Sequence, residues 1–245
     1  MNVLHLLLSF RHPPVHPGVV GKVLVLFLLN AMLPMAAGDE PLPVTPACLT
    51  RGEGDTTREA VLKIQPPEVE LLARLTYAEA SSTGFQDDPR VYVGIAWGVM
   101  NRVRLSAVSA TARRDYGSGV AGVIFKPQQF NPAVSLKSPF SRDFLCPRDA
   151  GRWTLAQEAA GRALVAADNP FIQTPWEQKQ GLSLVVNFYY PKSVQALGPL
   201  APWEANQALR FIGDPSAGGN LPSADRIRFY RLAQPPVDVN RHHDP

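Results

Sequence analysis

Apolar residues between positions 66 and 80 recur with the period of an amphipathic helix. Leu71, Leu72 and Leu75 fall on one face when successive residues are turned by about 100°. Two prolines open the segment and two glutamates follow, which suits the first turn of a helix and the positive end of its dipole. The pattern therefore predicts a helix over residues 66–80 with one face turned toward a core.

Glu79 continues the apolar face of this helix, where a carboxylate is unusual. It projects almost directly over Leu72 and within about 40° of Leu75. Burial and the negative end of the helix dipole both disfavour the charged carboxylate, so both raise its pKa. A carboxylic acid that stays protonated near neutral pH is a candidate general acid. The alternative is a structural glutamate that turns toward solvent, Arg74 or Arg102.

A second helix is predicted to begin at Asp87-Asp88-Pro89, because aspartate favours the cap and proline the first helical position. Residues 91–100 are apolar on every side, which is typical of a central buried helix, although their β-branched residues leave a strand as the alternative. Gly94 and Gly98 lie one turn apart and are expected to admit a closely packed helix. Residues 105–122 are polar and contain several glycines, which indicates a mobile loop.

The later part of the chain combines one predicted helix with two predicted strands. The helix is amphipathic and covers residues 154–167, whereas residues 182–190 and 226–232 have the composition of strands. Helices followed by a few strands favour an α+β fold, mainly helical with a small antiparallel sheet. We expect one folded domain over residues 66–233.

The two ends of the chain are predicted to lie outside this domain. Residues 1–38 have the order of a secretory signal peptide, with basic residues before an apolar run and small residues after it. The run is shorter than the roughly 20 residues that span a bilayer, so we expect a periplasmic or secreted protein; an uncleaved membrane anchor is the alternative. Residues 39–65 are rich in proline, threonine and glycine and predict a tether, and residues 234–245 predict a disordered tail.

The charge of the mature chain does not suit a nucleic-acid partner. Removal of residues 1–38 takes away two of the 24 basic residues and none of the 21 acidic ones, which lowers the net charge from +3 to +1. Lysine and arginine form no clustered stripe of the kind that binds phosphate backbones.

Cys48 and Cys146 are the two cysteines of the chain. An even count in an exported protein favours a disulfide, which would tie the N-terminal arm to the folded body. Closing a loop of about 100 residues would contribute up to about 4–5 kcal/mol through the entropy of the unfolded chain. Two free buried thiols are the alternative.

The predicted domain contains no histidine. His5, His12 and His16 lie in the signal peptide, and His242 and His243 lie in the tail. The domain therefore lacks the base of Ser-His and Cys-His nucleophile systems and the ligands of His-rich zinc sites, and we expect no metal and no cofactor. Carboxylates, amides, hydroxyls and aromatic rings remain, an inventory that suits the binding and acid-catalysed cleavage of sugars.

Several segments resemble the SleB-type cell-wall hydrolases, in the order in which that family carries them. The blocks are LLARLTYAEA (71–80), VMNRV (99–103), GVIFKPQQF (122–130), NFYYP (187–191), and a split closing block at 211–213 and 229–230. The resemblance covers residues 69–232. It implies a lysozyme-like domain that acts on peptidoglycan glycan strands as a lytic transglycosylase, with Glu79 at the position of the catalytic glutamate and no cofactor.

The same blocks supply candidates for binding the sugar. Asn101, Gln129 and Tyr189 are expected to position it, although each also has an ordinary structural explanation as a helix cap, a backbone partner or a core residue. Four further substrate-binding candidates come from these blocks: Tyr77, Phe130, Asn187 and Tyr190.

The chain departs from the family pattern after Glu79. The family carries a second acidic residue about four positions later, where this chain has Thr83. The following segment is longer than in the family, and its Asp87 and Asp88 are candidates for the missing carboxylate. Two other functions remain open: a non-catalytic peptidoglycan-binding or scaffold protein that keeps the fold, and a lysozyme-like muramidase.

Overall fold

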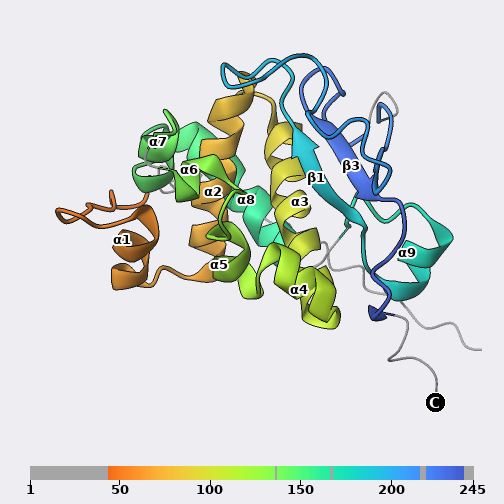
Figure 1. Ribbon diagram of the computed structural model, residues 1–245. Coiled ribbons are helices and arrows are strands. Elements are labelled where there is room, and N and C mark those ends of the chain that lie inside the picture. The colour runs from red at the N-terminus through yellow and green to blue at the C-terminus, as the bar shows by residue number, and fades with distance from the viewer. Residues whose placement is uncertain (1–43, 136, 166–167, 216–218, 240–245) are drawn as a thin grey trace, which may run out of the picture. The chain divides into compact units, whose positions relative to one another are not determined.

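The computed structural model describes residues 44–135, 137–165, 168–215 and 219–239 (Figure 1). The helices of this part are α1 (Thr57–Ile64), α2 (Glu68–Thr83), α3 (Pro89–Val108), α4 (Ala110–Tyr116), α5 (Gly119–Ile124), α6 (Asn131–Val134), α7 (Ser141–Leu145), α8 (Ala150–Leu164) and α9 (Pro175–Gln180). The strands are β1 (Val185–Tyr189), β2 (Leu209–Phe211) and β3 (Arg228–Leu232). The fold is therefore α+β and rich in helix, as predicted.

The predicted signal peptide over residues 1–38 lies outside the described residues. Within the residues that are described, no helix is both long enough and apolar enough to cross a membrane.

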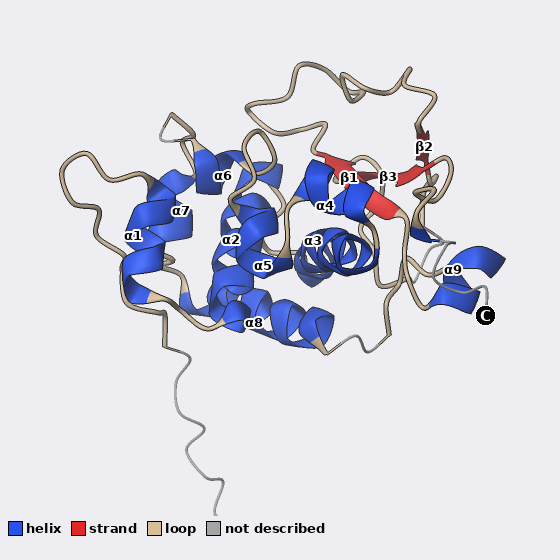
Figure 2. Ribbon diagram, turned by 60° about the horizontal axis from the view of Figure 1, so that its bottom comes forward, coloured by secondary structure: helices blue, strands red, loops and turns tan. Residues whose placement is uncertain are grey.

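Three predicted helices are confirmed as α2, α3 and α8. Helix α3 begins at Pro89, and the Asp88 side chain caps it by accepting a hydrogen bond from the Arg90 backbone N–H at 3.0 Å. Most of α3 is buried, and it contacts α2, α5 and α8 as well as α4 and β1. Figure 2 looks almost along α3, which lies between the other long helices and the sheet.

The two predicted strands are confirmed as β1 and β3, which pair antiparallel, and β2 pairs with the other edge of β3. The glycines of α3 face this sheet rather than another helix, contrary to our expectation. A Cβ atom on Gly94 would lie 2.5 Å from the Phe229 ring, and one on Gly98 would lie 2.8 Å from the Phe188 ring. The absent side chains therefore make room for two aromatic rings that are cross-strand partners in the sheet.

The mobile loop expected over residues 105–122 is wrong. The segment holds the end of α3, all of α4 and the start of α5. The Ser109 hydroxyl caps α4 by accepting a hydrogen bond from the Ala112 backbone N–H at 3.0 Å. Gly117 then turns the chain at a φ of 102°, where its missing side chain avoids a clash with the backbone of Gly122. The polar residues of this segment are caps and turns between short helices.

The expected tether over residues 39–65 also differs from the structure, because its described part contains α1. A capping box starts this helix: the Thr56 hydroxyl accepts from the Glu59 N–H, and the Glu59 carboxylate accepts from the Thr56 N–H at 2.7 Å. Val61 of α1 is buried in the main core. The described part of the segment is thus attached to the folded body.

The described start of the expected tail, residues 234–239, is likewise attached to the fold. Asp238 accepts hydrogen bonds from the Ser109 hydroxyl at 2.7 Å and the Thr111 N–H at 3.0 Å, and Val239 is buried. These two hydrogen bonds to Asp238 lower its pKa to about 2, so the carboxylate stays charged at neutral pH.

The chain before α1 is joined to the body by a disulfide between Cys48 and Cys146. Next to the disulfide, the buried Arg74 guanidinium donates to the Leu145 carbonyl at 2.9 Å and to the Ala47 carbonyl at 2.8 Å. Arg74 also pairs with Glu70, so it is not a partner of Glu79. A covalent bond and a buried cation therefore hold the same two segments together.

Loss of the disulfide should lower the free energy of unfolding. It closes a sequence separation of 98 residues, and a loop of about that length is worth up to about 4–5 kcal/mol through the unfolded chain. Urea unfolding of the native protein with and without reductant measures the change. The double variant Cys48→Ser/Cys146→Ser should match the reduced protein and ignore reductant. Equal stability of the oxidised and reduced proteins would contradict the prediction.

Candidate active site

Glu79 lies in the last turn of α2, at the wall of a cavity of about 300 Å³. Its side chain is buried, with the residue only 5% exposed, and the Tyr190 hydroxyl donates a hydrogen bond to Glu79 Oε2 at 2.8 Å. Burial raises the pKa of Glu79 to about 7, while the Tyr190 hydrogen bond and the charge of Arg102 act in the opposite direction. The carboxyl is therefore balanced between its acid and base forms at neutral pH.

Arg102 of α3 supplies the positive charge that acts on Glu79. It is buried, its Nε donates to the Val186 carbonyl and its Nη1 donates to Gln129 Oε1 at 2.5 Å. The guanidinium also lies over the Phe130 ring, 4.7 Å from its centroid. Burial lowers the pKa of Arg102 to about 10, so it keeps its charge at neutral pH.

Amide and aromatic side chains complete the cavity wall. The amides are Gln128, Gln129, Asn131, Asn187 and Gln195. The aromatic residues are Phe188, Tyr189, Tyr190 and Trp203. The Trp203 indole N–H is buried and has no hydrogen-bond partner within the described chain, so it is an unused donor. Such a wall combines flat apolar faces with neutral donors and acceptors, the chemistry that suits a sugar.

Comparison of this chain with protein-family models, with curated proteins and with solved structures finds no match. The resemblance to the SleB-type hydrolases therefore stays a prediction.

Five of the predicted site residues line the cavity: Glu79, Gln129, Asn187, Tyr189 and Tyr190. Tyr77 instead accepts hydrogen bonds from the backbone N–H groups of Arg148 at 3.4 Å and Asp149 at 3.2 Å, at the start of α8. Phe130 is buried under Arg102. These two residues support the fold around the site and do not line its cavity.

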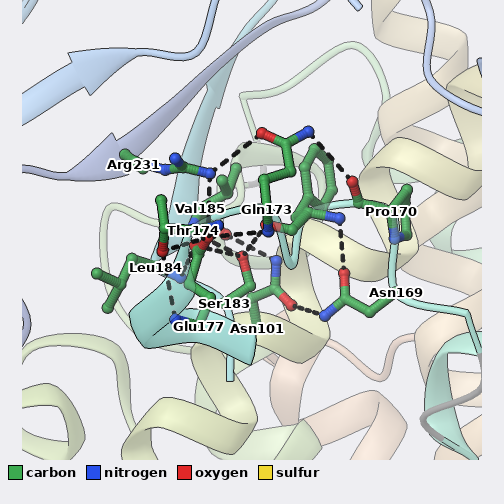
Figure 3. Close-up of polar contacts among 11 residues, drawn as sticks. Asn101, Asn169, Pro170, Gln173, Thr174, Glu177, Ser183, Leu184, Val185 and Arg231 are labelled. Atoms are coloured by element: carbon green, nitrogen blue, oxygen red, sulfur yellow. Dashed lines mark hydrogen bonds and ion pairs between the residues drawn. The ribbon is translucent and has the colours of Figure 1, made fainter. Parts of the chain in front are cut away.

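Asn101 is also a supporting residue. Its amide donates to the Val185 carbonyl at 2.9 Å and its oxygen accepts from Asn169 Nδ2 at 2.9 Å, as Figure 3 shows. Asn101 is buried and does not line the Glu79 cavity. The bond to Val185 fastens β1 to α3, and β1 leads directly to Tyr190.

The prediction that Asp87 or Asp88 supplies a second carboxylate is wrong. Asp87 is exposed and pairs with Arg152 at 3.1 Å, whereas Asp88 caps α3 and pairs with Arg90 and Arg226. Neither lines the cavity, and among the described lining residues Glu79 is the sole carboxylate. At the position of the family's second acid, the Thr83 hydroxyl donates to the Ala80 carbonyl at 2.8 Å and closes the end of α2.

Other cavity-lining residues were not among the predicted site residues, and Arg102 was considered only as a partner of Glu79. Gln128 adjoins the predicted Gln129, and its backbone is left-handed with a φ of 65°, a conformation that is uncommon outside glycine. Trp203 and Gln195 lie in the irregular segment after β1, where no periodicity marks a residue as buried or exposed. Only the three-dimensional fold brings them to Glu79.

Glu177 provides a comparison within the same protein, because it is a second fully buried glutamate. Figure 3 shows it accepting hydrogen bonds from the backbone N–H groups of Thr174 and Leu184 at 2.9 Å each, and pairing with Arg231 at 3.2 Å. Burial acts to raise the pKa of Glu177, but these partners outweigh it and the pKa is lowered. Glu177 is a charged structural anchor, which Glu79 is not.

We expect Glu79→Gln to stabilise the protein increasingly as the pH rises. The pKa of Glu79 is raised from its ordinary value of 4.5 to about 7 in the folded protein. Its contribution to the free energy of unfolding is therefore fully present below pH 4.5 and is lost as the pH rises past about 7. The difference in unfolding free energy between variant and wild type should therefore grow by up to about 3 kcal/mol from pH 4 to pH 8. Urea titrations at a series of pH values measure it.

The matched control for this titration is Glu158→Gln, which removes an exposed glutamate of α8. Its difference from wild type should stay constant over the same range. If the difference in unfolding free energy between Glu79→Gln and wild type is also independent of pH, the pKa of Glu79 is not raised in the folded protein.

Proposed function

We propose that this protein is an exported enzyme that cleaves peptidoglycan glycan strands, a lytic transglycosylase with a lysozyme-like domain. The observation that carries the proposal is Glu79, a lone buried carboxyl with a pKa of about 7 at the wall of a cavity of amides and aromatic rings. The resemblance of residues 69–232 to the SleB-type hydrolases supports the same conclusion.

In the proposed reaction Glu79 acts first as an acid and then as a base. Its proton passes to the oxygen that bridges N-acetylmuramic acid and N-acetylglucosamine, and the bond from that oxygen to C1 of the muramic residue breaks. The 6-hydroxyl of the same sugar then bonds to C1 and returns a proton to Glu79, which forms a 1,6-anhydro ring. One carboxyl is enough because the internal hydroxyl replaces both water and an enzyme nucleophile.

Neighbouring side chains suit these two steps. The Tyr190 hydroxyl holds Glu79 Oε2 and leaves Oε1 for the proton that is transferred. Gln129 uses its oxygen to accept from Arg102, so its amide nitrogen is the end that can donate to a sugar.

Glu79→Gln should abolish glycan cleavage while leaving the fold and binding to the cell wall intact. Glutamine keeps the size of the side chain but delivers no proton, and the loss should reach at least about 10³–10⁴-fold because one residue serves as acid and base. Mass analysis of fragments released from purified sacculi gives the readout.

The wild-type fragments separate the alternatives. Anhydro ends support the lyase, reducing ends would indicate a muramidase, and binding without release would indicate a non-catalytic wall protein. Retention of more than about a tenth of the activity in Glu79→Gln would rule out Glu79 as the acid and base.

The rate should fall as the pH rises above about 7, because Glu79 then loses the proton that the first step needs.

In Tyr190→Phe a hydrogen bond to the charged carboxylate is lost, so the pKa of Glu79 should rise further. The alkaline limb of kcat/KM should then move to higher pH, by up to about one unit. Tyr189→Phe is the control, since that hydroxyl bonds to the Gly198 carbonyl and not to Glu79. If the alkaline limb of kcat/KM does not move in Tyr190→Phe, a group other than Glu79 controls it.

A further inference from the structure

A second cavity, of about 760 Å³, adjoins the cavity that contains Glu79. Helix α1 forms one wall and the chain around α6 forms the other, and Figure 1 shows these two helices near one another. Gln128 and Asn131 line both cavities, so the two hollows meet at these side chains. Helix α1 lies before the segment that resembles the SleB-type family, so this wall is a feature of the present chain.

The lining of the α1 cavity differs from that of the Glu79 cavity. Apolar side chains form much of it, including Val134 and Leu62, which is 43% exposed. The aromatic Phe125 offers no open face, because the residue is 7% exposed and its ring lies at 89° to that of Phe144. A sugar ring therefore finds no aromatic surface here on which to stack.

Two polar groups of α1 remain without partners in the described structure. Thr57 is only 2% exposed, and its hydroxyl has no hydrogen-bond partner. Arg58 is exposed and takes part in no ion pair. The neighbouring Glu59 carboxylate is already used, since it accepts from the N–H and the hydroxyl of Thr56. Glu59 remains a charged carboxylate, so this wall carries one charge of each sign, and Arg58 is the one whose donors are unused within the described structure.

We propose that the α1 cavity binds an acidic peptide, namely the peptide stem that branches from the muramic-acid residues of the glycan. Aliphatic walls accept the small side chains of such a stem, the amides of Gln128 and Asn131 match its backbone, and Arg58 matches its carboxylates. A stem on a sugar near Glu79 reaches this cavity across Gln128 and Asn131. The inference rests on the proposed function, because it takes peptidoglycan as the substrate.

Binding of two polymers by the Glu79→Gln protein tests the proposal without cleavage. One polymer is purified glycan carrying its peptide stems, and the other is the same glycan stripped of stems by an amidase; both are fluorescently labelled. The dissociation constant should be about 5–10-fold lower for the stem-bearing glycan. Equal affinities would overturn the stem site.

Variants of α1 test whether the preference for the stem-bearing glycan arises in the α1 cavity. Arg58→Gln removes the cation and should reduce the ratio of the two dissociation constants by up to about fivefold, which is what an exposed ion pair contributes. Leu62→Glu places a negative charge in the cavity and should abolish the preference. Ile64→Glu is the matched control, because Ile64 is an equally apolar residue of the same turn, 56% exposed and not part of the cavity lining. An equal loss in Leu62→Glu and Ile64→Glu would overturn the proposal.

Cleavage by the protein with Glu79 intact separates the two proposals. Tighter binding of the stem-bearing glycan without any cleavage supports the stem site and contradicts the lyase activity. Cleavage without a stem preference supports the lyase and contradicts the stem site. Absence of binding to either glycan contradicts both.

Discussion

The attachment of β1 to α3 determines where the candidate site forms. Asn101 and Arg102 are successive residues of α3, and their side chains donate to the carbonyls of Val185 and Val186, two successive residues at the start of β1. One turn earlier, Gly98 leaves room for the Phe188 ring against the helix. These contacts fix β1 at its start and its middle. Tyr190, which follows the strand, therefore reaches Glu79 of α2, 111 residues away in sequence, and donates a hydrogen bond to it.

The two buried glutamates show why burial alone does not identify a catalytic acid. Both residues lose their hydration, which favours the neutral form. Glu177 recovers that loss from several backbone N–H groups and Arg231, and it remains charged. Within the described structure Glu79 receives a hydrogen bond from Tyr190 and feels the charge of Arg102, which together do not restore its ordinary pKa. The two glutamates therefore differ in the number of donors that offset their burial, and this difference accounts for the opposite directions of their pKa shifts.

Local sequence signals predicted those elements whose determinants are local. The Asp88-Pro89 start of α3 is an example, and the apolar period of α2 placed Glu79 on a buried face. The capping box between Thr56 and Glu59 is equally local, but the overall composition of residues 39–65 outweighed it and α1 was missed. Asn101 was misjudged for another reason, because its partner lies 84 residues away and no local pattern reveals a side chain that bonds to a distant backbone.

The charge of the site follows from its two buried ionisable groups. Arg102 keeps its proton at neutral pH, while Glu79 changes between neutral and negative near pH 7. The pair is therefore positive when Glu79 is the acid and neutral when it is the base. Such a change acts on nearby charges, and under the proposed function a positive site favours the approach of a glycan whose peptide stems are acidic. In the proposed reaction the same positive charge opposes the cation that develops as the glycosidic bond breaks. Transfer of the proton from Glu79 would resolve this conflict, since it restores a carboxylate beside the developing positive charge at the moment when stabilisation is needed.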